Sequence, residues 1–233
     1  MAVFVLVHGA WGGSYGFRRV RGLLQSAGHE VVTPSLTGIG ERSHLTGPLV
    51  GLTTHVLDVV NVVRYEDLTD IVLLGFSYGG MVVSGALEQI GDRVRELVLL
   101  DAFLPDDGDS VASMTDGALG RPVDDLGTPW LVPATPREFE DPDVGPWSNP
   151  RRVGQPVRTL TEAVRLRTPL EGWPFGRTYI RATQDPNGAM FDASAARARA
   201  SGAWRYHEIA TTHMVPENRP AELAAHLLAL ATW

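Results

Sequence analysis

The sequence predicts an α/β protein with a mostly parallel sheet of about six strands, helices on both faces and a small cap insertion. Short, continuous runs of β-branched and apolar residues alternate with segments of helical periodicity at both ends of the chain. This alternation is typical of parallel strands joined by crossover helices. The 233 residues are 44% hydrophobic and 20% charged, which suits a globular protein with a sizeable core.

The first part of the chain predicts four strands and three helices. Ser14 is a candidate cap of the first helix and Gly28 a natural stop for it. The next helix is indicated by valines at 56, 59, 60 and 63, which have helical spacing. In chain order we expect strand 3–7, helix 15–27, strand 30–33, helix 53–65, strand 71–74, helix 81–90 and strand 97–100.

The middle of the chain has a different texture. Residues 104–174 hold 11 of the 16 prolines, an acidic first part and an arginine-rich second part. Only 159–167 is typical of a helix, and the apolar periodicity is too weak for an independent core. We therefore expect a single domain over 1–233, with its core in 1–104 and 175–233 and a cap insertion at about 105–174.

The α/β pattern resumes after the insertion. We expect strand 177–181, helix 192–200, strand 204–209 and helix 217–231. Asp192 is the expected cap of the helix that it opens.

The composition excludes several classes of chemistry. The chain has no cysteine, and all 20 of its basic residues are arginine. Disulfides, thiolate metal sites, cysteine nucleophiles, lysine Schiff bases and the P-loop are therefore excluded. We expect no cofactor and no metal, since the sequence has neither a dinucleotide fingerprint nor clustered metal ligands.

Charge and hydropathy limit the partners and the location. The formal net charge of −7 disfavours nucleic acid and anionic membranes. No apolar run is long enough for a membrane helix, and the short start of the chain reads as a strand rather than a signal peptide. We expect a cytoplasmic protein with a small-molecule partner, and a homodimer stays open.

The main catalytic signal is the pentapeptide Gly75-Phe76-Ser77-Tyr78-Gly79, between a predicted strand and a predicted helix. Small residues two positions before and after a serine permit a tight turn that exposes its hydroxyl, which is a nucleophile elbow. The following helix directs its N-terminus at the site, which favours negative charge there. Ser77 is therefore the predicted nucleophile, although a glycine-rich turn with a capping serine would have the same pattern.

A serine nucleophile needs a base, and His213 is the candidate among seven histidines. It lies in a short polar loop between the last predicted strand and helix, where this fold places its base.

An acidic residue should orient that base, and three positions compete. Asp185 is preferred because it follows the strand 177–181 in the order Ser, Asp, His. Asp101, at the end of the fourth strand, and Asp192, whose position a helix cap explains, stay as alternatives.

The oxyanion hole should consist of backbone N–H groups. The Tyr78 amide follows the nucleophile, and the Ala10 amide lies in the loop after the first strand. Neighbouring glycines at 9, 12 and 13 would let a ligand approach this backbone closely.

These segments resemble small α/β-hydrolases of the plant methylesterase and hydroxynitrile lyase group and their bacterial esterase-like relatives. The matching segments are 5–11, 28–31, 75–80, 104–106, 183–185 and 212–214. The resemblance implies an α/β-hydrolase fold, a Ser77–His213–Asp185 triad and an oxyanion hole at Ala10 and Tyr78. In the lyases, a threonine and a lysine occupy the positions of Gly9 and Met214, so both residues here match the esterase pattern.

We therefore expect a serine esterase, a carboxylesterase that cleaves a small ester, lactone or thioester through an acyl-enzyme. The alternatives are a lyase or other non-hydrolytic carbon–carbon enzyme, and a ligand-binding protein with the same fold. Arg181 is the cation nearest in sequence to the acid loop, so it is the first residue to check before the lyase alternative is dismissed. The expected pocket residues are Gly9, Trp11, Phe103, Trp130 and Met214, with Met190 as a further candidate.

Overall fold

The computed structural model describes residues 1–121 and 129–231 and contains a six-stranded parallel sheet. Its strand order is β2-β1-β3-β4-β7-β8. The strands are β1 (Val3–Val7), β2 (Glu30–Val32), β3 (Ile71–Phe76), β4 (Val94–Leu100), β7 (Gly176–Ala182) and β8 (Arg205–Ile209). The predicted fold class is confirmed, and every predicted strand is present with small changes at its ends.

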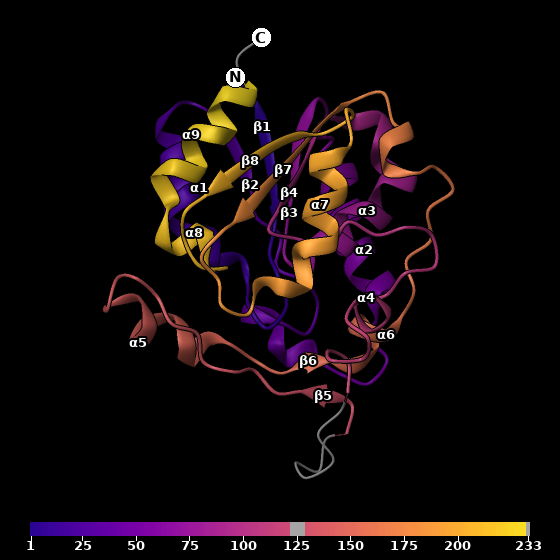
Figure 1. Cartoon of the computed structure of the whole chain (residues 1–233), viewed down its shortest axis with the longest axis vertical. Helices are drawn as coiled ribbons and strands as arrows, with labels where there is room; N and C mark the ends of the chain where they lie inside the picture. The colour runs from indigo at the N-terminus through magenta and orange to yellow at the C-terminus, as the bar shows by residue number, and fades with distance from the viewer. Residues whose placement is uncertain (122–128, 232–233) are drawn as a thin grey trace.

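Helices cover both faces of this sheet (Figure 1). One face carries α1 (Arg18–Ser26), α8 (Val215–Asn218) and α9 (Pro220–Ala231), and the other carries α2 (Leu52–Tyr65), α3 (Gly79–Ile90) and α7 (Asp192–Ala200). Each face has its own apolar core. The valines that predicted the second helix are buried in the core beneath α2 and α3, as their spacing requires. Short 3-10 turns are η1 (Ser14–Phe17), η2 (Gly40–Leu45), η3 (Gly91–Arg93) and η7 (Gly188–Phe191).

The insertion lies at the end of the sheet to which the arrowheads of β7 and β8 point (Figure 1). It contains an antiparallel pair of short strands, β5 (Leu131–Val132) and β6 (Gln155–Pro156). Its helical segments are α4 (Val111–Met114), α5 (Val144–Ser148), η5 (Asn149–Arg151), α6 (Val157–Thr161) and η6 (Leu170–Gly172). The expected helix at 159–167 is shorter than predicted and starts earlier, as α6.

The insertion is fastened to the loop after β1 through Trp11. The Trp11 amide donates to Gln155 Oε1 at 3.0 Å, and its indole N–H donates to the Val132 carbonyl at 3.0 Å. The Val153 amide in turn donates to the Trp11 carbonyl at 3.1 Å. Three hydrogen bonds on one residue thus bring the insertion over the carboxyl end of β1, where ligands bind in open α/β sheets.

Three further local predictions differ from the structure. The expected helix 217–231 is divided into α8 and α9, because Pro220 disfavours helical geometry at Arg219, whose φ and ψ are −128° and 51°. Asp192 does not cap α7; its carboxylate instead accepts a hydrogen bond from Arg181 at 2.8 Å. Similarly, the Ser14 side chain caps neither η1 nor α1.

Among the described residues, no helix has the length and apolar character needed to cross a bilayer.

Candidate active site

Ser77 occupies a strained turn between β3 and α3. Its φ is 57°, in the left-handed region that non-glycine residues rarely adopt. A Cβ on Gly75 would lie 2.6 Å from the Gly79 carbonyl oxygen, and one on Gly79 would lie 2.6 Å from the Val7 carbonyl oxygen. Both flanking positions must therefore be glycine for the backbone to pack this closely. This is the geometry on which the sequence prediction of a nucleophile elbow rests.

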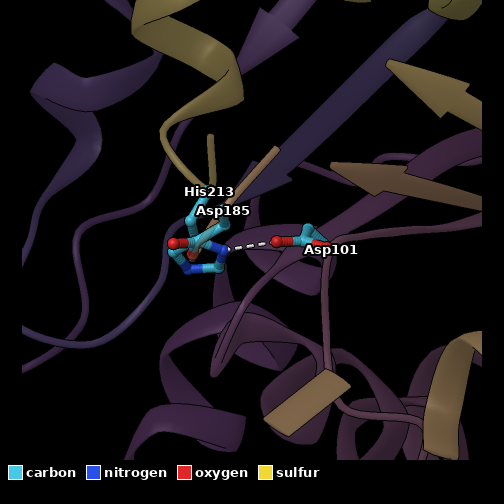
Figure 2. Close-up of side chains that lie close together, drawn as sticks. All are labelled: Asp101, Asp185 and His213. Carbon is cyan, nitrogen blue, oxygen red and sulfur yellow. Dashed lines mark hydrogen bonds and ion pairs between the residues drawn. The ribbon is translucent and has the colours of Figure 1, made fainter. Parts of the chain in front are cut away.

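His213 is held through one ring nitrogen by Asp101. Its Nδ1–H donates to Asp101 Oδ2 at 2.6 Å (Figure 2). The His213 side chain is 9% exposed and that of Asp101 is fully buried. The rings of Phe76 and Phe191 stack against the imidazole, with centroids 4.7 and 5.0 Å away. These contacts fix the ring plane and leave Nε2 free of the orienting hydrogen bond.

Asp185, the preferred candidate for the orienting acid, does not hydrogen bond to His213. Figure 2 shows the dashed line running from His213 to Asp101 alone. The Asp185 carboxylate accepts a hydrogen bond from the Asn187 amide at 3.0 Å and lies within 4.8 Å of the other two residues. The structure thus gives the orienting hydrogen bond to Asp101, which was an alternative. Both residues follow adjacent strands, β4 and β7, so their strand ends bring both carboxylates to the same imidazole.

Arg181 stabilises the buried charge of Asp101. Its Nη1 donates to Asp101 Oδ1, and its Nη2 donates to Asp192 Oδ1 at 2.8 Å and to the Gly188 carbonyl at 2.9 Å. The Ala182 amide donates to the same Asp101 oxygen at 3.2 Å. Asp101 is therefore paired at both oxygens, which offsets the cost of burying a carboxylate. The Arg181 guanidinium is occupied by these contacts and lines neither cavity next to Ser77.

The two predicted oxyanion-hole amides have no competing partner. Neither the Ala10 nor the Tyr78 N–H donates a hydrogen bond to another described residue. Gly9 lies directly against the nucleophile, because a Cβ built on it would be 2.9 Å from Ser77 Cβ and 3.3 Å from Oγ. The adjacent Trp11 has a φ of 61°, a second strained position at the site.

Buried histidines hold the two segments that carry the predicted oxyanion-hole amides. The Tyr78 hydroxyl donates to His55 Nδ1 at 2.8 Å, and His55 Nε2–H donates to the Thr37 carbonyl at 2.8 Å. Burial lowers the pKa of His55 to about 4, so the ring is neutral and this tautomer satisfies both nitrogens. His8 makes the equivalent pair: its Nδ1–H donates to the Gly9 carbonyl, and its Nε2 accepts from the Leu36 amide.

Two cavities meet at Ser77 and His213. We name the first the basic chamber; its lining includes Tyr15, Arg137, Arg152 and Glu217. We name the second the apolar cavity. Its lining includes Phe103, Val111, Leu119, Leu160 and Phe191. Ser77 Oγ and His213 make no mutual hydrogen bond in this structure, but both face the same two spaces.

The expected pocket residues are distributed over these cavities. Gly9 and Met214 line the basic chamber, Phe103 and Met190 line the apolar cavity, and Trp11 lines both. Trp130 lines neither of them. It precedes β5, and its carbonyl accepts a hydrogen bond from the amide of Val157, which follows β6. The residues that sequence reasoning missed are Tyr15, Arg137, Arg152 and Glu217. Their positions in separate helices and loops carry no shared spacing that could have revealed them.

Asp101, Asp185 and His213 have the residue types of a metal site, with ligand atoms within 4.8 Å of one another. However, Asp101 is already bonded to His213 Nδ1 and to the Arg181 cation. A metal ion would have to compete with both, so this arrangement suits the orientation of a histidine better than metal binding.

The chain belongs to the α/β hydrolase family, whose sequence model matches residues 4–226. It is 49% identical over 119 residues to a carbendazim hydrolyzing esterase of Nocardioides sp. (strain SG-4G), a match that covers 51% of this chain and 49% of the relative. It is also 30% identical over 104 residues to an alpha-hydroxynitrile lyase of Arabidopsis thaliana, covering 44% of this chain and 40% of that protein. The chain thus matches about half or less of the length of these curated relatives.

The fold has a solved counterpart over its whole length. An extracellular α/β-hydrolase from a Paenibacillus species, described as sharing structural and functional homology with tobacco salicylic acid binding protein 2, superposes with a TM-score of 0.82. The superposition covers 98% of each chain at 24% identity, so this likeness shows the fold alone.

Proposed function

We propose that the protein is a serine hydrolase that cleaves a small carboxylic ester, lactone or thioester. The observation that carries the proposal is His213, fixed through Nδ1 by buried Asp101, in the same cavities as Ser77 on its strained elbow. This geometry supports a Ser77–His213–Asp101 triad in place of the one expected with Asp185.

The proposed reaction proceeds in two steps. Ser77 Oγ attacks the carbonyl carbon while His213 Nε2 takes its proton, and the amides of Ala10 and Tyr78 stabilise the oxyanion. The alcohol leaves with the proton from His213, and an acyl-enzyme forms. His213 then removes a proton from water, which attacks the acyl carbon; the bond to Oγ breaks, His213 returns the proton to Ser77 Oγ, and the acid is released.

Two features disfavour the lyase alternative. Gly9 and Met214 match the esterase pattern, and the Arg181 cation is bonded to Asp101, Asp192 and Gly188. Because one relative is named for hydrolysing carbendazim, that compound belongs in the substrate panel with nitrophenyl esters and mandelonitrile. The cytoplasmic location and the homodimer stay predictions of the sequence.

Covalent labelling tests the proposal. A fluorophosphonate probe should label the wild-type protein at Ser77, and S77A should lose the label and about 10³-fold or more of nitrophenyl acetate hydrolysis. The exposed serine variant S26A is the matched control and should retain both. An unlabelled wild type without hydrolysis would favour the binding-protein alternative, and faster cyanide release than ester hydrolysis would favour the lyase.

A further inference from the structure

The basic chamber contains an unusual set of unpartnered polar atoms. Among the described residues, the buried side-chain atoms without a hydrogen-bond partner are Tyr15 Oη, Arg95 Nε, Arg137 Nε and Glu217 Oε2. Three of these four line the chamber that ends at Ser77 and His213. Buried polar groups without partners are costly, so their concentration in one cavity indicates a place where a bound group completes them.

The chamber also has uncompensated positive charge. The Arg152 guanidinium Nε donates to the neutral Thr135 carbonyl at 3.2 Å, and among the described residues neither Arg152 nor Arg137 has a carboxylate within ion-pair distance. Burial lowers the pKa of Arg152, and the neighbouring charge of Arg137 lowers it further. Two guanidinium groups thus face one desolvated space.

Glu217 does not supply the missing negative charge at neutral pH. Its side chain is 7% exposed, and burial raises its pKa to about 8. A Cβ on Gly16 would lie 3.3 Å from Glu217 Oε1, so the glycine gives the carboxyl group room against η1. A protonated carboxyl can donate a hydrogen bond, as can the Tyr15 hydroxyl and Arg137 Nε. All three unpartnered atoms can therefore act as hydrogen-bond donors.

We propose that the basic chamber binds a carboxylate on the substrate, so that the preferred substrate is an ester that also carries a free carboxylate. This inference rests on the proposed function, because it assigns the substrate class of the same site. Arg137 and Arg152 attract the carboxylate, and the side chains of Tyr15, Arg137 and Glu217 donate to its oxygens. The ester carbonyl then lies at Ser77, where the two cavities meet. The protein as a whole has a net charge of −7, but the arginines of this chamber give it a local charge of the opposite sign.

A kinetic series tests the carboxylate preference. The substrates are 4-nitrophenyl monoesters of succinic, glutaric and adipic acid, each compared with the ester whose terminal carboxylate is a primary amide. At the best chain length, kcat/KM should be at least tenfold higher for the acid than for the amide, mainly through KM. The ratio should fall to about one in R137M and R152M, whereas R165M, which removes an exposed arginine elsewhere in the insertion, should keep it. The proposal would be overturned if the acid-to-amide ratio were one in the wild type, or if the high ratio persisted in both R137M and R152M.

A binding measurement separates this proposal from the proposed hydrolysis. In S77A, monomethyl glutarate should bind at least tenfold more tightly by calorimetry than its terminal amide, and the difference should disappear in S77A/R152M. Binding without any esterase activity in the wild type would leave the chamber assignment intact and remove the hydrolase. Esterase activity in the wild type, with equal affinities of S77A for the acid and the amide, would support the hydrolase and remove the chamber assignment.

The pH dependence of this binding reports on Glu217. The charged and titratable groups that face it are Tyr15 from η1, Arg19 from α1, Arg152 from the insertion and the chamber residues Arg137 and His213. Above pH 8 the Glu217 carboxylate would repel the ligand, so the acid-to-amide affinity ratio in S77A should fall between pH 7 and 9. In S77A/E217Q the fall should be absent. A pH-independent ratio in both proteins would show that Glu217 does not face the bound carboxylate.

Discussion

At the residue scale, Asp101 is hydrogen bonded at both of its carboxylate oxygens. Its carboxylate accepts the His213 N–H at one oxygen, and the Arg181 guanidinium and the Ala182 amide at the other. Its φ of 40° places it among the strained non-glycine residues of the site. Strain that persists at such a position has to be offset by its surroundings, and these hydrogen bonds supply that compensation.

The Asp101 contacts make a definite prediction for D101N. Arg181 and the Ala182 amide both donate, so they hold the asparagine oxygen and turn its NH₂ toward His213. The imidazole would then carry its proton on Nε2, the tautomer that cannot accept the Ser77 proton, and kcat should fall by about 10³–10⁴-fold. Nitrophenyl acetate kinetics measure this. The matched variant D185N should lose less than tenfold, and the opposite order of losses would return the orienting role to Asp185.

At the element scale, the close approach of β1, β3 and α3 shapes the site. The N-terminus of α3 lies against the end of β1, where the Val7 and His8 carbonyls face Gly79. The Tyr78–His55 hydrogen bond then ties the same turn to α2. The elbow and the loop after β1 are therefore positioned by the same packing, which also places the two proposed oxyanion donors.

Variant G79A tests this packing. Its Cβ would lie 2.6 and 2.9 Å from the Val7 and His8 carbonyl oxygens, so α3 must move away from β1. We expect a loss of about 1–3 kcal/mol in the free energy of unfolding, measured in urea, together with reduced esterase activity. The control is G22A in α1, where a Cβ meets nothing within 4 Å. Alanine there should stabilise the helix by about 0.5–1 kcal/mol, and equal effects of the two variants would contradict the packing argument.

At the scale of the whole molecule, the two faces of the sheet have apolar cores, and a few ionisable side chains are buried as well. Glu217 is the clearest case, since burial raises its pKa from about 4.5 to about 8. Between these values the folded protein binds a proton that the unfolded chain releases. Its contribution to stability is thus fully present below pH 4.5 and is lost as the pH rises through 8.

This linkage predicts how E217Q changes the stability curve. Relative to the variant, the wild type should lose roughly 3–5 kcal/mol of unfolding free energy between pH 4.5 and pH 8. Urea denaturation at several pH values measures the difference between the two proteins, which cancels the contributions of His8 and His55. Parallel curves for wild type and E217Q would mean that Glu217 keeps its ordinary pKa in the folded protein.

Sequence alone determined the strands, the order of the main helices, the elbow at Ser77 and the candidate base His213. These features are local, since apolar runs, helical spacing and the small residues around the serine follow from neighbouring positions in the chain. The steric reason for glycine at 75 lies within the turn, where a Cβ would meet the Gly79 carbonyl, whereas the reason for glycine at 79 is the close approach of β1.

Only the tertiary structure decided which acid meets His213 and what else surrounds Ser77. Asp101 follows β4 and Asp185 follows the neighbouring strand β7, so the chain brings both carboxylates near the imidazole. In the folded structure Asp101, held by Arg181, forms the hydrogen bond to His213. The basic chamber joins Tyr15, Arg137, Arg152 and Glu217 from separate parts of the chain. These contacts join residues that are far apart in the sequence, and they form only when the insertion packs over the sheet. The same packing buries Glu217 and raises its pKa. No local sequence pattern encodes either feature.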